Sequence, residues 1–297
     1  MKVLALDVGG TAIKSALFEQ ERILVKTELP SDGGLGKKAL LERIRQSVSC
    51  YKAFDAIGIS TAGQVDSRTG IITGASDNIP DYTGTNLKEI FEEAYQVPVF
   101  VENDVNAAAL GELHYGCGRD EPDFLCLTFG TGIGGAIVIN REVYKGAFGA
   151  AGEIGHIMTH PGGEACTCGL KGCYEQYASA SAFIRQVSSR FPELTDGKKI
   201  MEAMKRESEN DCLQRLTDGW ISEIAYGLAT LVHIFNPSLM ILGGGIFSEP
   251  YLLPIIRQKL KENIIESFRP VRLKTAELGN LAGLYGVLAV CRSEMKL

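Results

Sequence analysis

Residues 151–176 of this chain, AGEIGHIMTHPGGEACTCGLKGCYEQ, gather side chains whose types and spacing predict a metal site. Cys166, Cys168 and Cys173 follow His156 in a glycine-rich stretch. Thiolate sulfur and imidazole nitrogen suit Zn²⁺, and four such ligands make a closed structural tetrahedron with no position left for water. His160 is an alternative fourth ligand, because the spacing does not separate it from His156. A surface disulfide between two of the cysteines is the competing interpretation, and it is disfavoured for an intracellular chain.

A second pattern, DVGGTAIK at residues 7–14, is typical of a phosphate-binding turn. Backbone N–H groups of glycines can approach phosphate oxygens closely. The carboxylate of Asp7 suits Mg²⁺, which prefers one or two carboxylates and keeps several waters. We therefore expect a nucleotide site that includes Asp7 as the Mg²⁺ ligand and Gly9, Gly10, Thr11 and Lys14 near the phosphates.

Two more glycine turns are expected at the same nucleotide. GTGIGG begins at Gly130, Thr131 and Gly132, and the run Gly243, Gly244 and Gly245 leaves room for the nucleoside. The sequence GxxxxGK[ST] is absent from the chain, which excludes a P-loop enzyme.

A candidate general base lies in VFVENDVNAAALGE, residues 99–112. The pattern predicts a buried strand followed by an alanine-rich helix that begins near Asp104. A carboxylate at a helix N-terminus is favoured in its ionised form, which suits a group that accepts a hydroxyl proton during phosphoryl transfer. The alternative is that Asp104 only caps the helix.

The elements that must position these groups form a repeat. Residues 3–18 align without gaps on residues 124–139, and each segment reads as two apolar strands joined by a glycine turn. Further strands are expected at 56–60, 97–103 and 238–245, with helices at 37–50, 86–95, 211–235 and from about 281 to 291. The pattern predicts an α/β protein of two lobes, 1–117 and 118–297, with a cleft between them and the C-terminal helix, about 281–297, packed back on the first lobe.

Composition excludes several classes of partner. The chain has 297 residues and a formal net charge of −6. An acidic protein lacks the cationic footprint that nucleic acids and anionic membranes require. Because no apolar leader or membrane-length run is present, we expect a cytoplasmic protein without a membrane partner.

Taken in order, DVGGTAIK, GISTAGQVD, ENDVNAAALGE, GTGIGG, AGEIGH, CTCGLKGC and LGGG resemble the ROK family of repressors and sugar kinases, and the resemblance covers nearly the whole chain. It implies two actin-like (ribonuclease H-like) lobes and an ATP-dependent kinase that transfers the γ-phosphoryl group to a sugar hydroxyl, usually the 6-OH. ATP, Mg²⁺ and a structural Zn²⁺ are the implied cofactors, and a homodimer is the implied assembly.

The same resemblance implies roles for individual residues. Asp104 becomes the catalytic base. The implied sugar-binding residues are Gly63, Asn78, Asn103, Asp104, Glu153, His156 and Glu175. His156 has two implied roles, since one ring nitrogen binds zinc while the other can face a sugar hydroxyl.

The sequence leaves the sugar open among hexoses such as glucose, N-acetylhexosamines such as N-acetylmannosamine, and β-glucosides. Many glucokinase-like members have a tryptophan in the region where this chain has Tyr82, which suggests a different wall near Asn78. The rival functions are a sugar-responsive ROK-type transcriptional regulator and a non-catalytic sugar-binding protein. No basic recognition helix precedes Asp7, and both Asp7 and Asp104 are present, so we expect the kinase.

Overall fold

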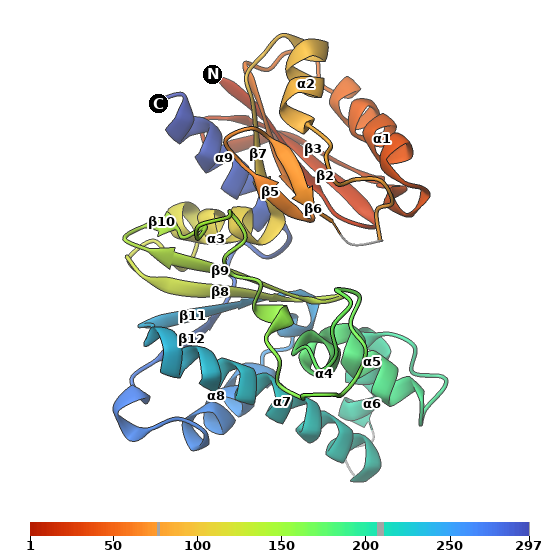
Figure 1. Ribbon diagram of the computed structural model, residues 1–297, viewed down its shortest axis with the longest axis vertical. Helices are drawn as coiled ribbons and strands as arrows, with labels where there is room; N and C mark the ends of the chain where they lie inside the picture. The colour runs from red at the N-terminus through yellow and green to blue at the C-terminus, as the bar shows by residue number, and fades with distance from the viewer. Residues whose placement is uncertain (76–77, 207–210, 297) are drawn as a thin grey trace. The chain divides into compact units, whose positions relative to one another are not determined.

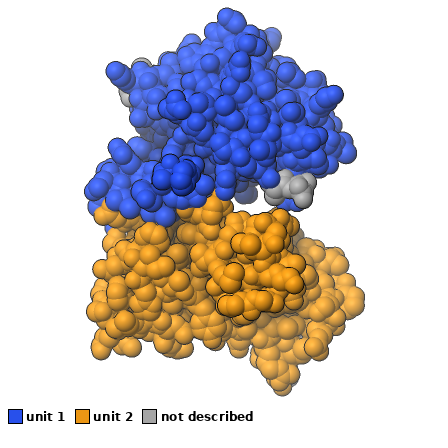
Figure 2. Space-filling model, in the orientation of Figure 1, with its two compact units in different colours: residues 1–122, 136–151, 276–297 blue, residues 123–135, 152–275 orange. Residues whose placement is uncertain are grey.

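The computed structural model describes residues 1–75, 78–206 and 211–296, and within them the chain forms two compact units. Unit 1 contains residues 1–122, 136–151 and 276–297, and unit 2 contains residues 123–135 and 152–275 (Figure 2). Neither unit is one continuous run of chain. The division into lobes at residues 117 and 118 that the sequence suggested stays a prediction.

The sheet of unit 1 has the strand order β3-β2-β1-β4-β7. Its first three strands form an antiparallel meander, whereas β1, β4 and β7 run parallel to one another. The bounds are β1 Lys2–Val8, β2 Ala12–Glu19, β3 Arg22–Pro30, β4 Ala56–Thr61 and β7 Val99–Asn103. A separate hairpin pairs β5 Gln64–Asp66 with β6 Ile71–Gly74.

Both faces of this sheet are buried, which explains why its central strands are nearly continuous apolar runs. Along β1, Leu4, Leu6 and Val8 belong to one core cluster, while the alternate residues Val3 and Ala5 belong to another. The helices of unit 1 are α1 Lys37–Ser49, α2 Leu87–Tyr95, α3 Asp104–Tyr115 and α9 Ala282–Glu294. Residues of α1 and α2 contribute to the first cluster, and α9 contributes to the second.

Helices α3 and α9 pack closely because glycines remove the side chains between them. A Cβ atom on Gly286 of α9 would lie 1.7 Å from the carbonyl oxygen of Ala107, and one on Gly111 of α3 would lie 2.3 Å from that of Ala282. The C-terminal helix, drawn in blue in Figure 1, therefore lies against the helix that carries Asp104.

The second sheet has the order β10-β9-β8-β11-β12, and β8, β11 and β12 run parallel. Its strands are β8 Phe124–Phe129, β9 Ile133–Ile139, β10 Glu142–Val143, β11 Leu239–Gly243 and β12 Arg272–Thr275. The order repeats that of the first sheet, with the segments 3–18 and 124–139 in corresponding positions. The α/β class expected from the sequence is therefore confirmed.

The helices of unit 2 are α4 Glu175–Ala178, α5 Ala180–Ser188, α6 Gly197–Arg206, α7 Asp211–Phe235 and α8 Leu252–Glu262. The helix predicted at 211–235 matches α7, which ends before Asn236 and Pro237. Trp220 of α7 is buried and stacks on Phe183 of α5, with ring centroids 4.5 Å apart. Every helix among the described residues is too short or too polar to span a bilayer.

Candidate active site

Asp7 and Asp104 belong to the same edge of the first sheet. Asp7 lies near the end of β1, and Asp104 begins α3 directly after β7. Because β1, β4 and β7 are parallel, their carboxyl ends meet at one edge, where ligands of open α/β sheets usually bind. The structure thus brings together, within unit 1, the two carboxylates that the sequence separates by almost a hundred residues.

Asp7 is held by the neighbouring strand. The Ser60 hydroxyl of β4, its register partner, donates to Asp7 Oδ1 at 2.8 Å. A Cβ on Gly283 of α9 would lie 2.8 Å from the same oxygen, so a glycine is needed there to admit the carboxylate. Burial raises the pKa of Asp7, while the Ser60 hydroxyl and the charge of Lys14 oppose the rise. Ser60 is a site residue that the sequence did not single out, although it lies in the motif GISTAGQVD.

Asp104 is oriented by its own helix terminus. Its Oδ1 accepts hydrogen bonds from Asn103 Nδ2 and from the Val105 N–H, both at 2.9 Å. Removal from water, and secondarily the negative charge of Asp7, raises the pKa of Asp104 to about 6. A carboxylate with this pKa is ionised at neutral pH and still has appreciable affinity for a proton, as a general base requires.

Asn103 is the N-cap of α3, and its side-chain amide forms hydrogen bonds only with neighbouring groups of unit 1 among the described residues. Its Oδ1 accepts from the N–H groups of Val105 and Asn106, and its Nδ2 donates to the Gly63 carbonyl and to Asp104 Oδ1. An amide has two donor hydrogens and two acceptor lone pairs, so all four are engaged. A sugar hydroxyl would have to replace one of these bonds, and a sugar contact for Asn103 stays a prediction.

The remaining predicted residues of unit 1 lie in turns and in the β1–β2 hairpin. Gly10, Thr11 and Asn78 are exposed, and Lys14 is the register partner of Asp7 in the hairpin. The N–H of Gly9 closes the turn by donating to the Ala12 carbonyl at 2.9 Å. Gly63 has a φ of 96°, and a Cβ there would lie 2.8 Å from the Gly74 carbonyl, so this turn also requires glycine.

Tyr82 does not line a surface wall. Its side chain is 1% exposed in the core of unit 1, its hydroxyl is 2.8 Å from Thr61 Oγ1, and burial raises its pKa to about 12. A tyrosine in place of the tryptophan of glucokinase-like members therefore changes the packing of the core, and the Tyr82 side chain forms no surface wall near Asn78.

In unit 2, four ligand atoms from His156, Cys166, Cys168 and Cys173 lie within 4.8 Å of one another. Cys166 Sγ is 3.7 Å from His156 Nδ1, and the sulfurs of Cys168 and Cys173 are 3.6 Å apart. A tetrahedron with bonds of about 2.3 Å has edges of roughly 3.8 Å, so this donor set fits a zinc ion. Cys166, Cys168 and Cys173 are thiols in the structure and not partners in a disulfide, which argues against the disulfide alternative.

The tertiary structure places His156, rather than His160, beside the three cysteines. The His160 ring stacks on Tyr177 with centroids 3.8 Å apart, and its Nε2 is 3.5 Å from Glu223 Oε1. His156 instead belongs to the cysteine cluster. Its two nitrogens face different neighbours, because Nδ1 lies beside Cys166 while Nε2 lies 3.9 Å from Glu153 Oε2.

Glu175 connects the cysteine cluster to the glycine turn that begins at Gly130. Its Oε1 accepts from Cys166 Sγ at 3.1 Å, and its Oε2 accepts from the Ile133 N–H at 3.4 Å. A Cβ on Gly132 would lie 2.3 Å from Glu175 Oε2. Gly130, Thr131, Gly244 and Gly245 are exposed, whereas Gly243 is buried at the end of β11.

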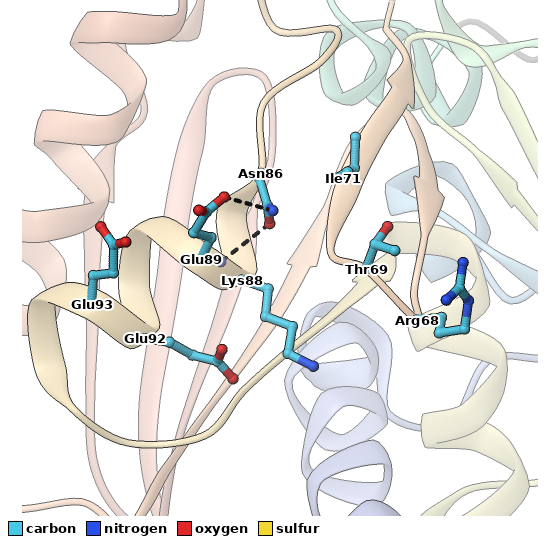
Figure 3. A pocket seen from close by; sticks show the side chains of 8 residues that line it. All are labelled: Arg68, Thr69, Ile71, Asn86, Lys88, Glu89, Glu92 and Glu93. Atoms are coloured by element: carbon cyan, nitrogen blue, oxygen red, sulfur yellow. Dashed lines mark hydrogen bonds between the residues drawn. The ribbon is translucent and has the colours of Figure 1, made fainter.

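A surface hollow of about 400 Å³ in unit 1 is separate from these groups (Figure 3). It lies beside α2 and the β5–β6 hairpin, and none of the predicted site residues lines it. Asn86 at its rim caps α2 by accepting from the Glu89 N–H, and it also donates to the Glu89 carboxylate. Asn86 and Glu89 therefore stabilise the start of α2. The residues that line the hollow carry charges of both signs.

Comparison with known proteins places the chain in a family. The family model described as "ROK family" matches residues 3–294. The chain belongs to the ROK family. Its relatives include a glucokinase of Streptomyces coelicolor, 34% identical over 97% of both chains, and a beta-glucoside kinase of Klebsiella pneumoniae, 31% identical over 97% of this chain and 95% of the relative.

A solved structure of a ROK family glucokinase from Streptomyces griseus, in complex with glucose and AMPPNP, is similar with a TM-score of 0.88 and 33% identity. The match covers 99% of this chain and 100% of that one. This ROK protein therefore has the α/β fold of the actin-like ATPases, as the sequence motifs implied.

Proposed function

We propose that this ROK protein is an ATP-dependent sugar kinase that transfers the γ-phosphoryl group of ATP to a sugar hydroxyl, the 6-OH in our expectation. The observation that carries the proposal is the environment of Asp104. A carboxylate with a pKa raised to about 6 begins a helix at the strand edge that also carries Asp7. The glucokinase and beta-glucoside kinase relatives support the same reaction.

Asp104 would act as the general base. Because its Oδ1 already accepts two N–H bonds, we assign proton transfer from the sugar hydroxyl to Oδ2. Asp7 would hold Mg²⁺, which supplies positive charge that offsets the phosphate charge. The raised pKa of Asp7 fits this role, since a buried carboxylate near a second carboxylate is stabilised by a cation. Phosphate contacts would come from the N–H groups of Gly9, Gly10 and Thr11, with Lys14 adding charge.

The residues of unit 2 would supply further contacts. We propose that Gly130, Thr131 and Gly132, with Gly243, Gly244 and Gly245, bind the nucleotide. Sugar hydroxyls would form hydrogen bonds with Glu153, His156 and Glu175. We propose that the sugar-binding residues of unit 1 are Gly63, Asn78, Asn103 and Asp104. A Zn²⁺ held by His156, Cys166, Cys168 and Cys173 would fix the ring of His156 so that Nε2 stays available for a hydroxyl.

The decisive experiment is a coupled assay of ADP release with ATP and Mg²⁺ over a panel of sugars. The panel contains glucose, N-acetylglucosamine, N-acetylmannosamine and β-glucosides, because the sugar itself is not fixed by the residues named above. We expect sugar-dependent ADP release with at least one of them. Binding of a sugar by calorimetry without any phosphorylation would instead favour a regulator or a non-catalytic binding protein.

The assembly and the compartment belong to the same proposal. We expect a homodimer in the cytoplasm, in line with the most common symmetry of soluble oligomers. Light scattering coupled to size-exclusion chromatography measures the mass in solution, and a monomer would contradict the expected assembly.

A further inference from the structure

Glu102 is a buried carboxylate on the turn that carries Asp104. It is the penultimate residue of β7, and its side chain is 3% exposed. Its Oε1 accepts from the Asn103 N–H at 3.1 Å and from Asn106 Nδ2 at 3.2 Å. These two bonds bracket Asp104, because one partner precedes it in the chain and the other lies in the first turn of α3. The orientation of Glu102 therefore affects a backbone N–H directly before the proposed base and a side-chain amide two residues after it.

Lys145 provides the cation for this carboxylate. Its Nζ donates to Glu102 Oε2 at 2.7 Å and also to the hydroxyl of Ser67 in the β5–β6 hairpin. Lys145 follows β10, so its ion pair with Glu102 and its hydrogen bond to Ser67 together join three segments of unit 1 that are distant in sequence. Its backbone carbonyl also accepts from the Ala151 N–H at 3.1 Å, which closes the loop 145–151.

The two oxygens of Glu102 thus have different partners. Oε1 holds the start of α3, and Oε2 is held by Lys145. The hairpin is also joined to the turn directly, since Asn103 Nδ2 donates to the Gly63 carbonyl at 2.9 Å. Among the described residues, Lys145 is the cation that pairs with this carboxylate. Without it, the buried carboxylate must move toward water, take up a proton or acquire a new partner, because an unpaired buried charge is strongly unfavourable. Each of these changes would displace or weaken the bonds from Oε1 to Asn103 and Asn106.

We propose that Lys145 is a positioning residue for phosphoryl transfer, acting through Glu102 on the turn that orients Asp104. The inference rests on the proposed kinase function. Lys145 itself need not touch the sugar or the nucleotide. Its effect is on the geometry of Asp104, where a displacement of about 1 Å can reduce turnover by roughly 100-fold.

The test compares Lys145→Met with Lys52→Met, a change at an exposed lysine of the same unit that serves as the control. We expect Lys145→Met to lower kcat by about 100-fold while the KM values for sugar and ATP change little. Lys145→Arg should recover most of the loss, since it restores the charge. The double variant Glu102→Gln with Lys145→Met should lose far less than the product of the two single effects, because the amide leaves no unpaired buried charge.

A readout without turnover separates this inference from the kinase proposal. Amide hydrogen exchange of the Val105 and Asn106 N–H groups should be faster in Lys145→Met than in Lys52→Met. Equal exchange and equal kcat in the two variants would overturn the role of Lys145, and so would a kcat loss that follows the fraction of unfolded protein. A wild-type protein that phosphorylates no sugar would overturn the kinase proposal, and the exchange comparison would still decide whether Lys145 holds the turn.

Discussion

At the scale of single residues, Asp104 combines two properties that oppose each other. It is the first residue of α3 and accepts N–H bonds that favour its ionised form, yet removal from water and the charge of Asp7 raise its pKa to about 6. A raised pKa would not help a carboxylate that only stabilised the helix N-terminus, because its ionised form does this best. The environment does suit a group that must exchange a proton near neutral pH.

Replacement of Asp104 tests the base assignment directly. Asp104→Asn should lower kcat by about 10²- to 10⁴-fold, because an amide cannot accept the proton, while sugar binding measured by calorimetry changes little. Asp120→Asn, at an exposed position of the same unit, is the matched control. Phosphorylation at the wild-type rate in Asp104→Asn would show that another group takes the proton.

The raised pKa of Asp104 also predicts a pH dependence. Because the base must be ionised, kcat/KM, which reports the ionisation of the free enzyme, should rise with pH through about 6 and then level off. A kcat/KM that stays constant between pH 5 and 7 would contradict the assignment.

The contribution of Asp104 to the free energy of unfolding should depend on pH in the opposite sense, falling as the pH rises. The pKa of Asp104 in the folded protein exceeds its ordinary value of 3.8, so the proton binds the folded state more tightly than the unfolded state. Its contribution to stability is present below about pH 4 and is lost as the pH rises through 6. Without Mg²⁺, Asp104→Asn should therefore raise the free energy of unfolding by about 1 to 3 kcal/mol at pH 7.5, and by much less at pH 4. Urea unfolding at the two pH values measures the difference, and an equal effect at both would contradict it.

At the scale of elements, α3 and α9 determine where the two carboxylates lie. Helix α3 carries Asp104 at its first position, and α9 places Gly283 against Asp7. The close approach of the helices requires the glycines at their contact. A change in that contact should therefore affect both stability and turnover.

Gly286→Ala tests the contact. Its Cβ would meet the Ala107 carbonyl at 1.7 Å, so we expect a loss of about 3 kcal/mol in the free energy of unfolding and a lower kcat. Gly219→Ala in α7 is the control, because a Cβ there meets nothing within 4 Å. That change should be neutral or stabilise by up to about 1 kcal/mol, since alanine favours helix more than glycine does. Similar effects of the two changes in denaturant unfolding would contradict the packing role of Gly286.

At the scale of the whole molecule, each compact unit carries one set of polar groups. Unit 1 has the carboxylates and the Glu102–Lys145 pair, and unit 2 has the cysteine cluster with Glu153 and Glu175. Burial raises the pKa values of Cys166 and Cys173. A metal must displace protons from these thiols, which links zinc binding to the folding of the loop.

Cys168→Ser should therefore release zinc, lower the Tm and weaken the affinity for sugar more than that for ATP. Cys50→Ser, at an exposed thiol of unit 1, is the control and should keep both zinc and affinity. Elemental analysis combined with calorimetry on both ligands measures these effects. Full zinc content in Cys168→Ser would show that the cluster binds the metal by another set of ligands.

The sequence alone determined the class of the fold, the family motifs and most elements, because strand and helix periodicity and glycine turns are local properties. The 211–235 helix and the 3–18 hairpin illustrate this. Local spacing also indicated three of the metal-ligand candidates, the cysteines, together with two histidines that it could not distinguish. Asp104 could be singled out because a carboxylate after a buried strand marks a helix start.

Only the tertiary structure decided the matters that depend on contacts between distant residues. It placed His156 in the cysteine cluster and His160 against Tyr177 and Glu223, it placed Tyr82 in the core, and it engaged every hydrogen-bonding group of Asn103. It also brought Lys145 to Glu102, a pair separated by 43 positions. No periodicity or spacing reports such pairs, since they form when parallel strands align their carboxyl ends and helices pack across them.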